Sequence, residues 1–252
     1  AFHAKQYEVA LPDLEAVIAS GTQDFLESAL FGASDILFRD HRWEGALEHY
    51  TKLEQVAAIP QNVLAAKVGR MRCLRELGRI DEAADAASKV IAEPGANNDL
   101  KAEAGLLQGR KAMEANSLDD AYVKFKAVVT ASTSEAGAEA KYHMAYVRYM
   151  QGKYTDTEKE VFDLVKKYPS YEDWKARGFI LLADAYVQLN DRFQAKATLQ
   201  SVIDHVSDPE LVAQARTRLD TILASEVQQT TPAPQEEIEA PIDESNPREN
   251  DE

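Results

Sequence analysis

Hydrophobic and polar positions along the chain recur with a long period. In six blocks a turn residue is followed by an aromatic or aliphatic residue, a polar or acid-rich pair, and a small residue that anchors the block. Successive anchors are 36, 37, 38, 36 and 38 residues apart. A spacing of this kind is typical of repeat proteins, in which each unit buries its apolar face against its neighbours. The anchors are Ala10, Ala46, Ala83, Ala121, Thr157 and Ala195.

Each period predicts two helices. The first is a long amphipathic stretch such as 135–150 or 174–189, and the Gly or Asn that follows it supplies the left-handed turn that ends a helix. The second helix carries the anchor and, four positions later, a bulky residue on the same helical face. The small residue lets the partner helix approach while the large one fills the groove. The bulky residues are Tyr50, Phe125, Val161 and Leu199.

Prolines mark where the second helices stop. Four of them stand 11 to 14 residues after an anchor, and proline cannot continue a helix interior but can open the next helix. No alternating β-branched runs bounded by turn residues occur, so the sequence predicts an all-α fold. The four prolines are Pro60, Pro94, Pro169 and Pro209.

The last period carries a family resemblance. Its residues 181–186 read Leu-Leu-Ala-Asp-Ala-Tyr, and its residues 190–195 read Asn-Asp-Arg-Phe-Gln-Ala. This order of leucine, small residue, aromatic, turn, aromatic and alanine resembles the tetratricopeptide repeat (TPR) consensus. The resemblance covers residues 5–225. It implies a right-handed α-solenoid of helix-turn-helix repeats whose first helices line a concave, peptide-binding face.

A second resemblance concerns the compartment. The period here is two to four residues longer than the usual length of about 34 in the family. Longer periods are common in bacterial envelope members such as the Tol-Pal coordinator and the outer-membrane assembly lipoproteins. Residues 141–223 also resemble the C-terminal part of large exported TPR proteins of Bacteroidota. These resemblances imply a periplasmic or outer-membrane-associated protein, with a cytoplasmic location as the alternative.

The pattern divides the chain into four segments. Residues 1–20 form a partial repeat whose first helix is missing, so we expect further repeats to precede Ala1 in the parent protein. Residues 21–207 form about five repeats, and residues 208–226 form a capping helix. Residues 227–252 form a disordered acidic tail, because this stretch contains four of the nine prolines and little apolar surface.

Charge narrows the range of partners. The chain has 28 basic and 43 acidic residues, for a net charge of −15, and residues 226–252 contribute −8 of it. Such a balance disfavours nucleic acids and anionic membranes, because repulsion opposes the encounter with phosphates. No apolar run approaches the ~20 residues that a membrane span needs. We therefore expect a protein or peptide partner; the oligomeric state stays open.

No motif points to catalysis. The single cysteine, Cys73, excludes an intrachain disulfide, and its place on a first helix predicts a small buried hydrophobe. The five histidines lack H-x-x-x-H and H-E-x-x-H spacing, and no nucleotide-binding glycine loop or G-x-S-x-G string occurs. Acidic pairs such as Asp119 and Asp120 recur at the starts of second helices, where they complement the helix dipole. The sequence predicts no enzyme, no cofactor and no metal.

Arginines and tyrosines mark the candidate binding site. In the family that the chain resembles, first helices line the concave face, and equivalent positions of this chain place three arginines and then three tyrosines there. Arginine and tyrosine dominate binding energy at interfaces. We expect the arginines to form a positive basin; in the alternative, they balance helix charge and the tyrosines fill gaps between repeats. The residues are Arg72, Arg75, Arg110, Tyr142, Tyr146 and Tyr149.

The sequence favours a non-catalytic scaffold that binds a partner peptide or loop on the concave face, as part of a larger bacterial envelope protein. Two alternatives stay open. The repeats could form a structural spacer that holds other domains apart. The chain could also be a non-catalytic subunit of an envelope assembly or secretion complex.

Overall fold

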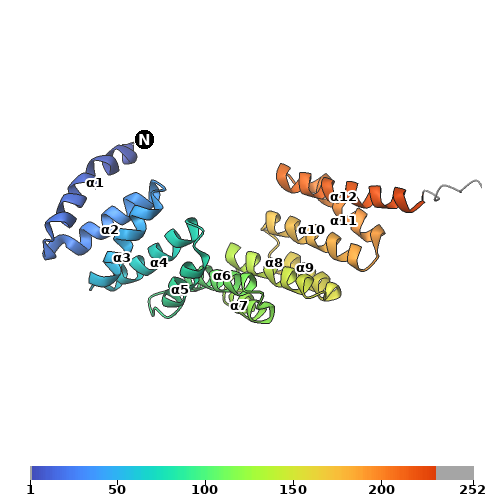
Figure 1. The fold of residues 1–252 in the computed structure, drawn as a ribbon, viewed down its shortest axis with the longest axis horizontal. Helices are drawn as coiled ribbons and strands as arrows, with labels where there is room; N and C mark the ends of the chain where they lie inside the picture. The colour runs from blue at the N-terminus through green and yellow to red at the C-terminus, as the bar shows by residue number, and fades with distance from the viewer. Residues whose placement is uncertain (1, 231–252) are drawn as a thin grey trace, which may run out of the picture.

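Twelve helices, without a strand, make up residues 2–230, the part of the backbone that this computed structural model describes (Figure 1). Side chains are described for residues 9–226. The helices alternate between an inner and an outer row, and two flanking helices complete the array. The inner helices are α2 (Gln23–Arg39), α4 (Pro60–Glu76), α6 (Asn98–Glu114), α8 (Glu135–Met150) and α10 (Glu172–Gln188). The outer helices are α3 (Trp43–Val56), α5 (Ile80–Ile91), α7 (Leu118–Ala131), α9 (Tyr154–Lys167) and α11 (Arg192–His205).

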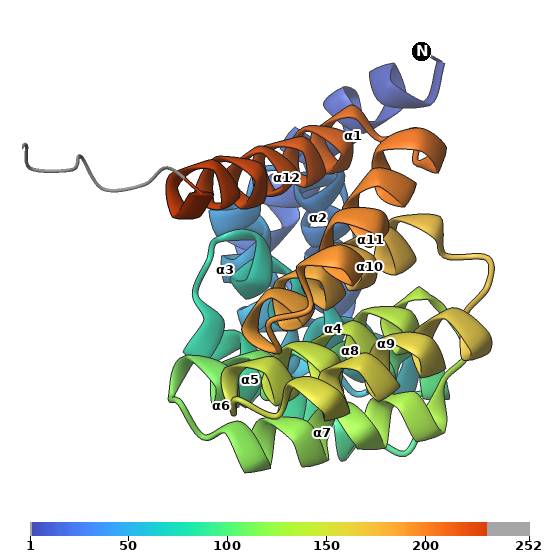
Figure 2. The same ribbon diagram turned by 90° about the vertical axis from the view of Figure 1, so that its right-hand side faces the viewer.

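The helices form an arc. Figure 1 shows the inner helices along the concave side and the outer helices along the convex side, with α1 (Phe2–Ser20) and α12 (Pro209–Thr230) at the two ends. Figure 2 shows the same array from its end, with both flanking helices above the middle repeats. Consecutive helices pack along the whole array, and inner helices also pack directly at α2–α4, α6–α8, α8–α10 and α10–α12. The predicted all-α solenoid is confirmed.

A left-handed residue follows every inner helix. After α6, Asn116 has a φ of 54°, and the amide of Ser117 donates to the carbonyl of Ala112 at 2.8 Å. This six-to-one hydrogen bond satisfies a carbonyl that the helix end leaves without a partner. The same bond closes the other four inner helices. The left-handed residues are His41, Gly78, Asn116, Gly152 and Asn190.

The predicted anchors form the seam between the two rows. The five anchors on α3, α5, α7, α9 and α11 are all 0% exposed, and the bulky residues four positions later are buried. These bulky residues pack against glycines of the inner helices: a Cβ on Gly109 would lie 2.4 Å from the Phe125 ring, and a Cβ on Gly69 would lie 2.3 Å from the Tyr50 ring. The absence of a side chain therefore sets how closely inner and outer helices approach.

Of the two flanking helices, only α12 is longer than the sequence pattern predicted. Helix α1 runs unbroken through Pro12. At the other end, the Asp208 carboxylate accepts a hydrogen bond from the Glu210 amide at 2.8 Å, which caps α12. The prediction that the capping helix stops at residue 226 is wrong, because α12 continues to Thr230. No helix breaker occurs before Pro232, and Lys196 of α11 holds Glu226 at 2.9 Å. The rest of the predicted tail lies outside the described residues.

The glycine contacts predict a stability difference. Replacing Gly109 with alanine forces a methyl group into the Phe125 ring, so Gly109→Ala should lower the free energy of unfolding by about 1–3 kcal/mol. Gly45→Ala is the matched control, because its nearest contact would be an ordinary 3.4 Å to Leu37 and alanine favours helix by ~1 kcal/mol. Urea denaturation measures both. Equal effects of the two substitutions would contradict the packing described here.

Candidate functional site

The six predicted site residues fall on three inner helices and into two separate groups. Arg72 and Arg75 lie on α4 and Arg110 lies on α6, whereas the three tyrosines lie on α8. Each group has its own contacts. The arginines pair with acidic side chains, and the tyrosines line a cavity.

Glu103 of α6 binds Arg72 and Arg75, the two predicted arginines of α4. The Arg72 Nη2 atom lies 2.7 Å from Glu103 Oε2, and its Nε atom lies 3.0 Å from Oε1. Arg75 Nη1 donates to the same Oε1 at 2.7 Å, and Arg75 also pairs with Glu76. Burial opposes the ionisation of Glu103, but the hydrogen bonds from the two arginines hold its pKa below the ordinary value. One carboxylate thus links two neighbouring repeats across the inner face.

Arg110 repeats this arrangement one unit further along. It pairs with Glu139 of α8, and His143 Nε2 lies 3.6 Å from the same carboxylate. The His143 ring stacks on Phe125 with centroids 5.0 Å apart. The predicted positive basin is therefore wrong, because carboxylates of the next inner helix compensate the charges of the arginines. These pairs link repeats.

The three tyrosines line a cavity of about 260 Å³ between α8, α10 and α12. Tyr142 and Tyr146 are stacked with centroids 6.4 Å apart, and the Tyr142 ring contacts Trp174 at 5.6 Å. Burial raises the pKa of the Tyr142 and Tyr149 phenols, so both stay protonated at neutral pH. The remaining lining residues are Arg177, Ile180, Leu181, Asp184, Gln214 and Arg218.

The tyrosine cavity contains two arginines that the sequence analysis did not single out. Arg218 Nε lies 3.0 Å from both oxygens of Asp184. Burial raises the pKa of Asp184, although the charge and hydrogen bond of Arg218 act to lower it. Arg177 lies over the Trp174 ring at 5.6 Å, and no carboxylate of residues 9–226 pairs with it. A signal for Arg177 was present in the sequence, since it stands seven positions before Asp184, two helical turns along one face.

A second inner cavity lies at the other end of the array. It measures about 360 Å³ between α2 and α4 and has an aromatic wall of Phe31 and Phe38. Phe31 is 40% exposed, which is high for a phenylalanine. Asp35 pairs with Arg39 at 2.9 Å on its rim. The inner face thus offers an aromatic cavity near each end and an ion-paired stretch between them.

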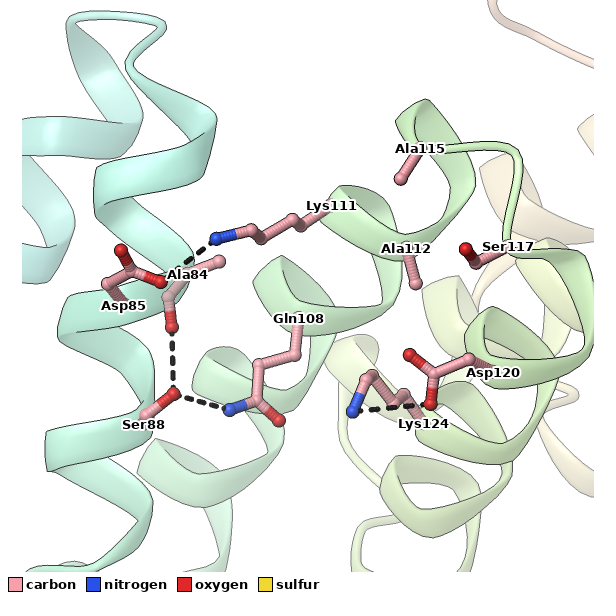
Figure 3. A pocket seen from close by; sticks show the side chains of 10 residues that line it. All are labelled: Ala84, Asp85, Ser88, Gln108, Lys111, Ala112, Ala115, Ser117, Asp120 and Lys124. Carbon is pink, nitrogen blue, oxygen red and sulfur yellow. Dashed lines mark hydrogen bonds and ion pairs between the residues drawn. The ribbon is translucent and has the colours of Figure 1, made fainter.

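The outer side carries grooves as well. Figure 3 shows one of about 330 Å³ between α5, α6 and α7. Its polar side chains bind one another: Lys111 pairs with Asp85 at 2.9 Å, and Gln108 donates to Ser88 at 2.9 Å. Lys124 pairs with Asp120 at 3.5 Å. The groove therefore presents few polar groups that lack a partner.

Other chemistry is limited in the part of the chain that the structure describes. Cys73 is fully buried, as predicted, and burial raises the pKa of its thiol to about 12, which keeps it protonated. Within the described residues, no group of three or more His, Cys, Asp or Glu side chains could hold a metal ion. None of the helices described is long and apolar enough to cross a membrane.

Comparison with known proteins identifies the repeats. A tetratricopeptide repeat family model matches residues 179–208, which include α11 and most of α10. No curated protein matches the sequence. Residues 179–208 thus carry the tetratricopeptide repeat signature, and solved proteins such as YrrB, described as a TPR protein, share the fold of the array.

Three solved structures show how far the likeness extends. BtubC from P. vanneervenii is 14% identical, with a TM-score of 0.59, and the alignment covers 96% of this chain and 97% of that one. YrrB, described as a TPR protein with an unusual peptide-binding site, is 17% identical, with a TM-score of 0.57 and coverages of 81% and 97%. A tetratricopeptide repeat protein from Parabacteroides merdae is 14% identical, with a TM-score of 0.52 and coverages of 86% and 92%. At such identities the likeness shows the fold alone, so the resemblance to exported Bacteroidota proteins stays a prediction.

The ion pairs predict a pH-dependent stability difference. Glu103→Gln removes the carboxylate that Arg72 and Arg75 share, so it should destabilise the fold by about 1–3 kcal/mol at pH 7. Folding lowers the pKa of Glu103, so the ion pair stabilises the fold fully at any pH above the pKa of the unfolded chain, about 4.3. This stabilisation disappears as the pH falls through the lower pKa of the folded state. Urea denaturation at pH 7 and in acid measures the difference in free energy of unfolding between wild type and variant, which should be smaller in acid.

Glu82→Gln is the control for this measurement. Glu82 pairs with Arg79 on the exposed surface, where such a pair adds little stability. A Glu103→Gln effect no larger than that of Glu82→Gln would show that the inner ion pairs do not hold the repeats together.

Proposed function

We propose that the chain is a non-catalytic scaffold that binds a partner peptide or loop on its inner face, within a larger protein of the bacterial envelope. The observation that carries the proposal is the pair of aromatic cavities near the two ends of this face. Each cavity exposes rigid rings beside apolar side chains, the combination that interfaces favour. The TPR fold and the peptide-binding site reported for YrrB support a protein partner.

The charge distribution supports an extended ligand. Between the two cavities, Glu103 and Glu139 already bind the predicted arginines, so this stretch offers less free charge than the sequence suggested. A peptide that crosses it would be anchored mainly at its ends by the two aromatic cavities. The six predicted residues keep their place in this proposal, with the tyrosines in contact with ligand and the arginines shaping the face between the anchors.

The envelope location rests on the long repeat period. Fractionation of the native cells tests it: recovery of the protein in the periplasmic or outer-membrane fraction would support this part of the proposal. Recovery in the cytoplasm alone would contradict it, without bearing on partner binding.

Substitutions on the two faces test the binding surface. Phe31→Ser removes an exposed inner ring and Tyr146→Ser removes a partly buried one. Together they should lower the affinity for a captured partner by about 2 kcal/mol or more. Phe162→Ser is the matched control, because Phe162 is 50% exposed on the outer helix α9. Titration of the partner by calorimetry gives the affinities.

The result separates the scaffold from the spacer. Loss of binding in the inner double variant alone supports the inner face. A capture experiment that yields no saturable partner favours the structural spacer, and a loss confined to Phe162→Ser places binding on the outer side. Charge reversal of Arg72 and Arg110 is less informative, because it would bring new carboxylates against Glu103 and Glu139.

A further inference from the structure

We propose that the tyrosine cavity, bounded by Tyr142, Tyr146, Arg177 and Arg218, binds an internal acidic side chain of the partner together with an adjacent large apolar side chain. This inference rests on the proposed function and names the chemistry of one end of that surface. In this proposal the acidic group of the partner is bound by Arg177 of α10 and Arg218 of α12, and not by the predicted arginines of α4 and α6.

The first argument is the availability of guanidinium donors. Arg177 has no carboxylate partner within residues 9–226, and its only contact of note is the Trp174 ring at 5.6 Å. Arg218 binds Asp184 through Nε alone, so its two terminal nitrogens have no acceptor in the described structure. An arginine has five donor hydrogens in a planar fork that suits a carboxylate. Both forks thus retain unused donors.

The second argument is charge. Two arginines face one aspartate in this cavity, whereas at Glu103 and Glu139 the basic groups are already bound to acids. An incoming carboxylate would balance the excess charge, and the low local dielectric would strengthen the contact.

The third argument is shape. The hydroxyl groups of the three tyrosines have no hydrogen-bond partner in residues 9–226, and protonated phenols can donate to a carboxylate. Ile180 and Leu181 add an apolar lining beside them. A volume of about 260 Å³ is small for a binding pocket, so it accommodates one or two side chains and no folded segment.

An internal side chain fits better than a chain terminus. The cavity shares the inner face with the Phe31 cavity at the other end of the array, so a ligand that contacts both is a continuous peptide. An Asp or Glu beside an aromatic or aliphatic residue would supply the two chemistries side by side. The carboxylate of a free C-terminus has the same charge, and the experiment distinguishes the two sources.

Peptide selection tests the proposal. The probe is a random peptide library displayed on phage with every C-terminus fused to the coat protein, so that no free carboxylate is offered. Selection on the wild-type chain should enrich Asp or Glu next to a large apolar residue. Selection on Arg177→Gln should lose the acidic preference, while Arg216→Gln should keep it. Arg216 is the matched control, because it is an exposed arginine of α12 outside the cavity.

Affinities of one selected peptide complete the test. In synthetic, C-terminally amidated form it should bind Arg177→Gln at least about tenfold more weakly than Arg216→Gln, with Arg177→Lys in between. Thermal unfolding of each variant should match wild type, since Arg177 has no ion pair to lose. Equal binding by Arg177→Gln and Arg216→Gln would overturn the proposal.

The remaining outcomes separate this inference from the proposed function. Peptides that bind only with a free C-terminus would overturn the internal acid as ligand. Binding that Phe31→Ser abolishes and Arg177→Gln leaves intact would retain the inner-face scaffold and refute the arginine anchor. If no peptide can be selected and no partner captured, both proposals fail.

Discussion

The close approach of inner and outer helices is the constraint on which the rest of the structure depends. A small anchor at 0% exposure recurs on each of the five outer helices, and on all of them except α5 a bulky residue follows four positions later. Glycines of the inner helices accept the rings of Tyr50 and Phe125. Because this contact repeats with the sequence period, every unit meets the next in nearly the same way. The arc, and with it the concave face, follows from that repetition. Side chains on the inner face are then free to vary without disturbing the seam.

The side chains of the inner face form two kinds of surface. In the middle of the inner face, Arg72, Arg75 and Arg110 bind acids of the following repeat, which adds links between neighbouring units. Near the ends, aromatic side chains surround cavities. Because these arginines are ion-paired, the middle of the inner face is not a basic groove. The C-terminal cavity differs, because the guanidinium of Arg177 has no carboxylate partner within residues 9–226.

Local rules predicted the repeats but not the partners of their side chains. Helix pairs, left-handed turns and the buried Cys73 follow from spacing and residue type within one unit, and the sequence predicted all of them. The pairing of Arg72 with Glu103 joins residues 31 positions apart, and it depends on the angle between repeats, which no local pattern encodes. Arg177 was missed because it lies outside the positions of α10 that are equivalent to Tyr142, Tyr146 and Tyr149 of α8. The extension of α12 to Thr230 was missed because composition alone was used to begin the tail at residue 227.

Photo-crosslinking tests the central claim, that partners bind the inner face at its aromatic cavities, most directly. A benzophenone amino acid placed at Phe31 or Tyr146 reports on the inner cavities, and the same group at Phe162 or Val123 reports on exposed outer positions. With a captured partner or a selected peptide bound, irradiation should give crosslinked product from the two inner positions and background levels from the two outer ones. Efficient crosslinking from Phe162 or Val123, with none from Phe31 and Tyr146, would contradict the account.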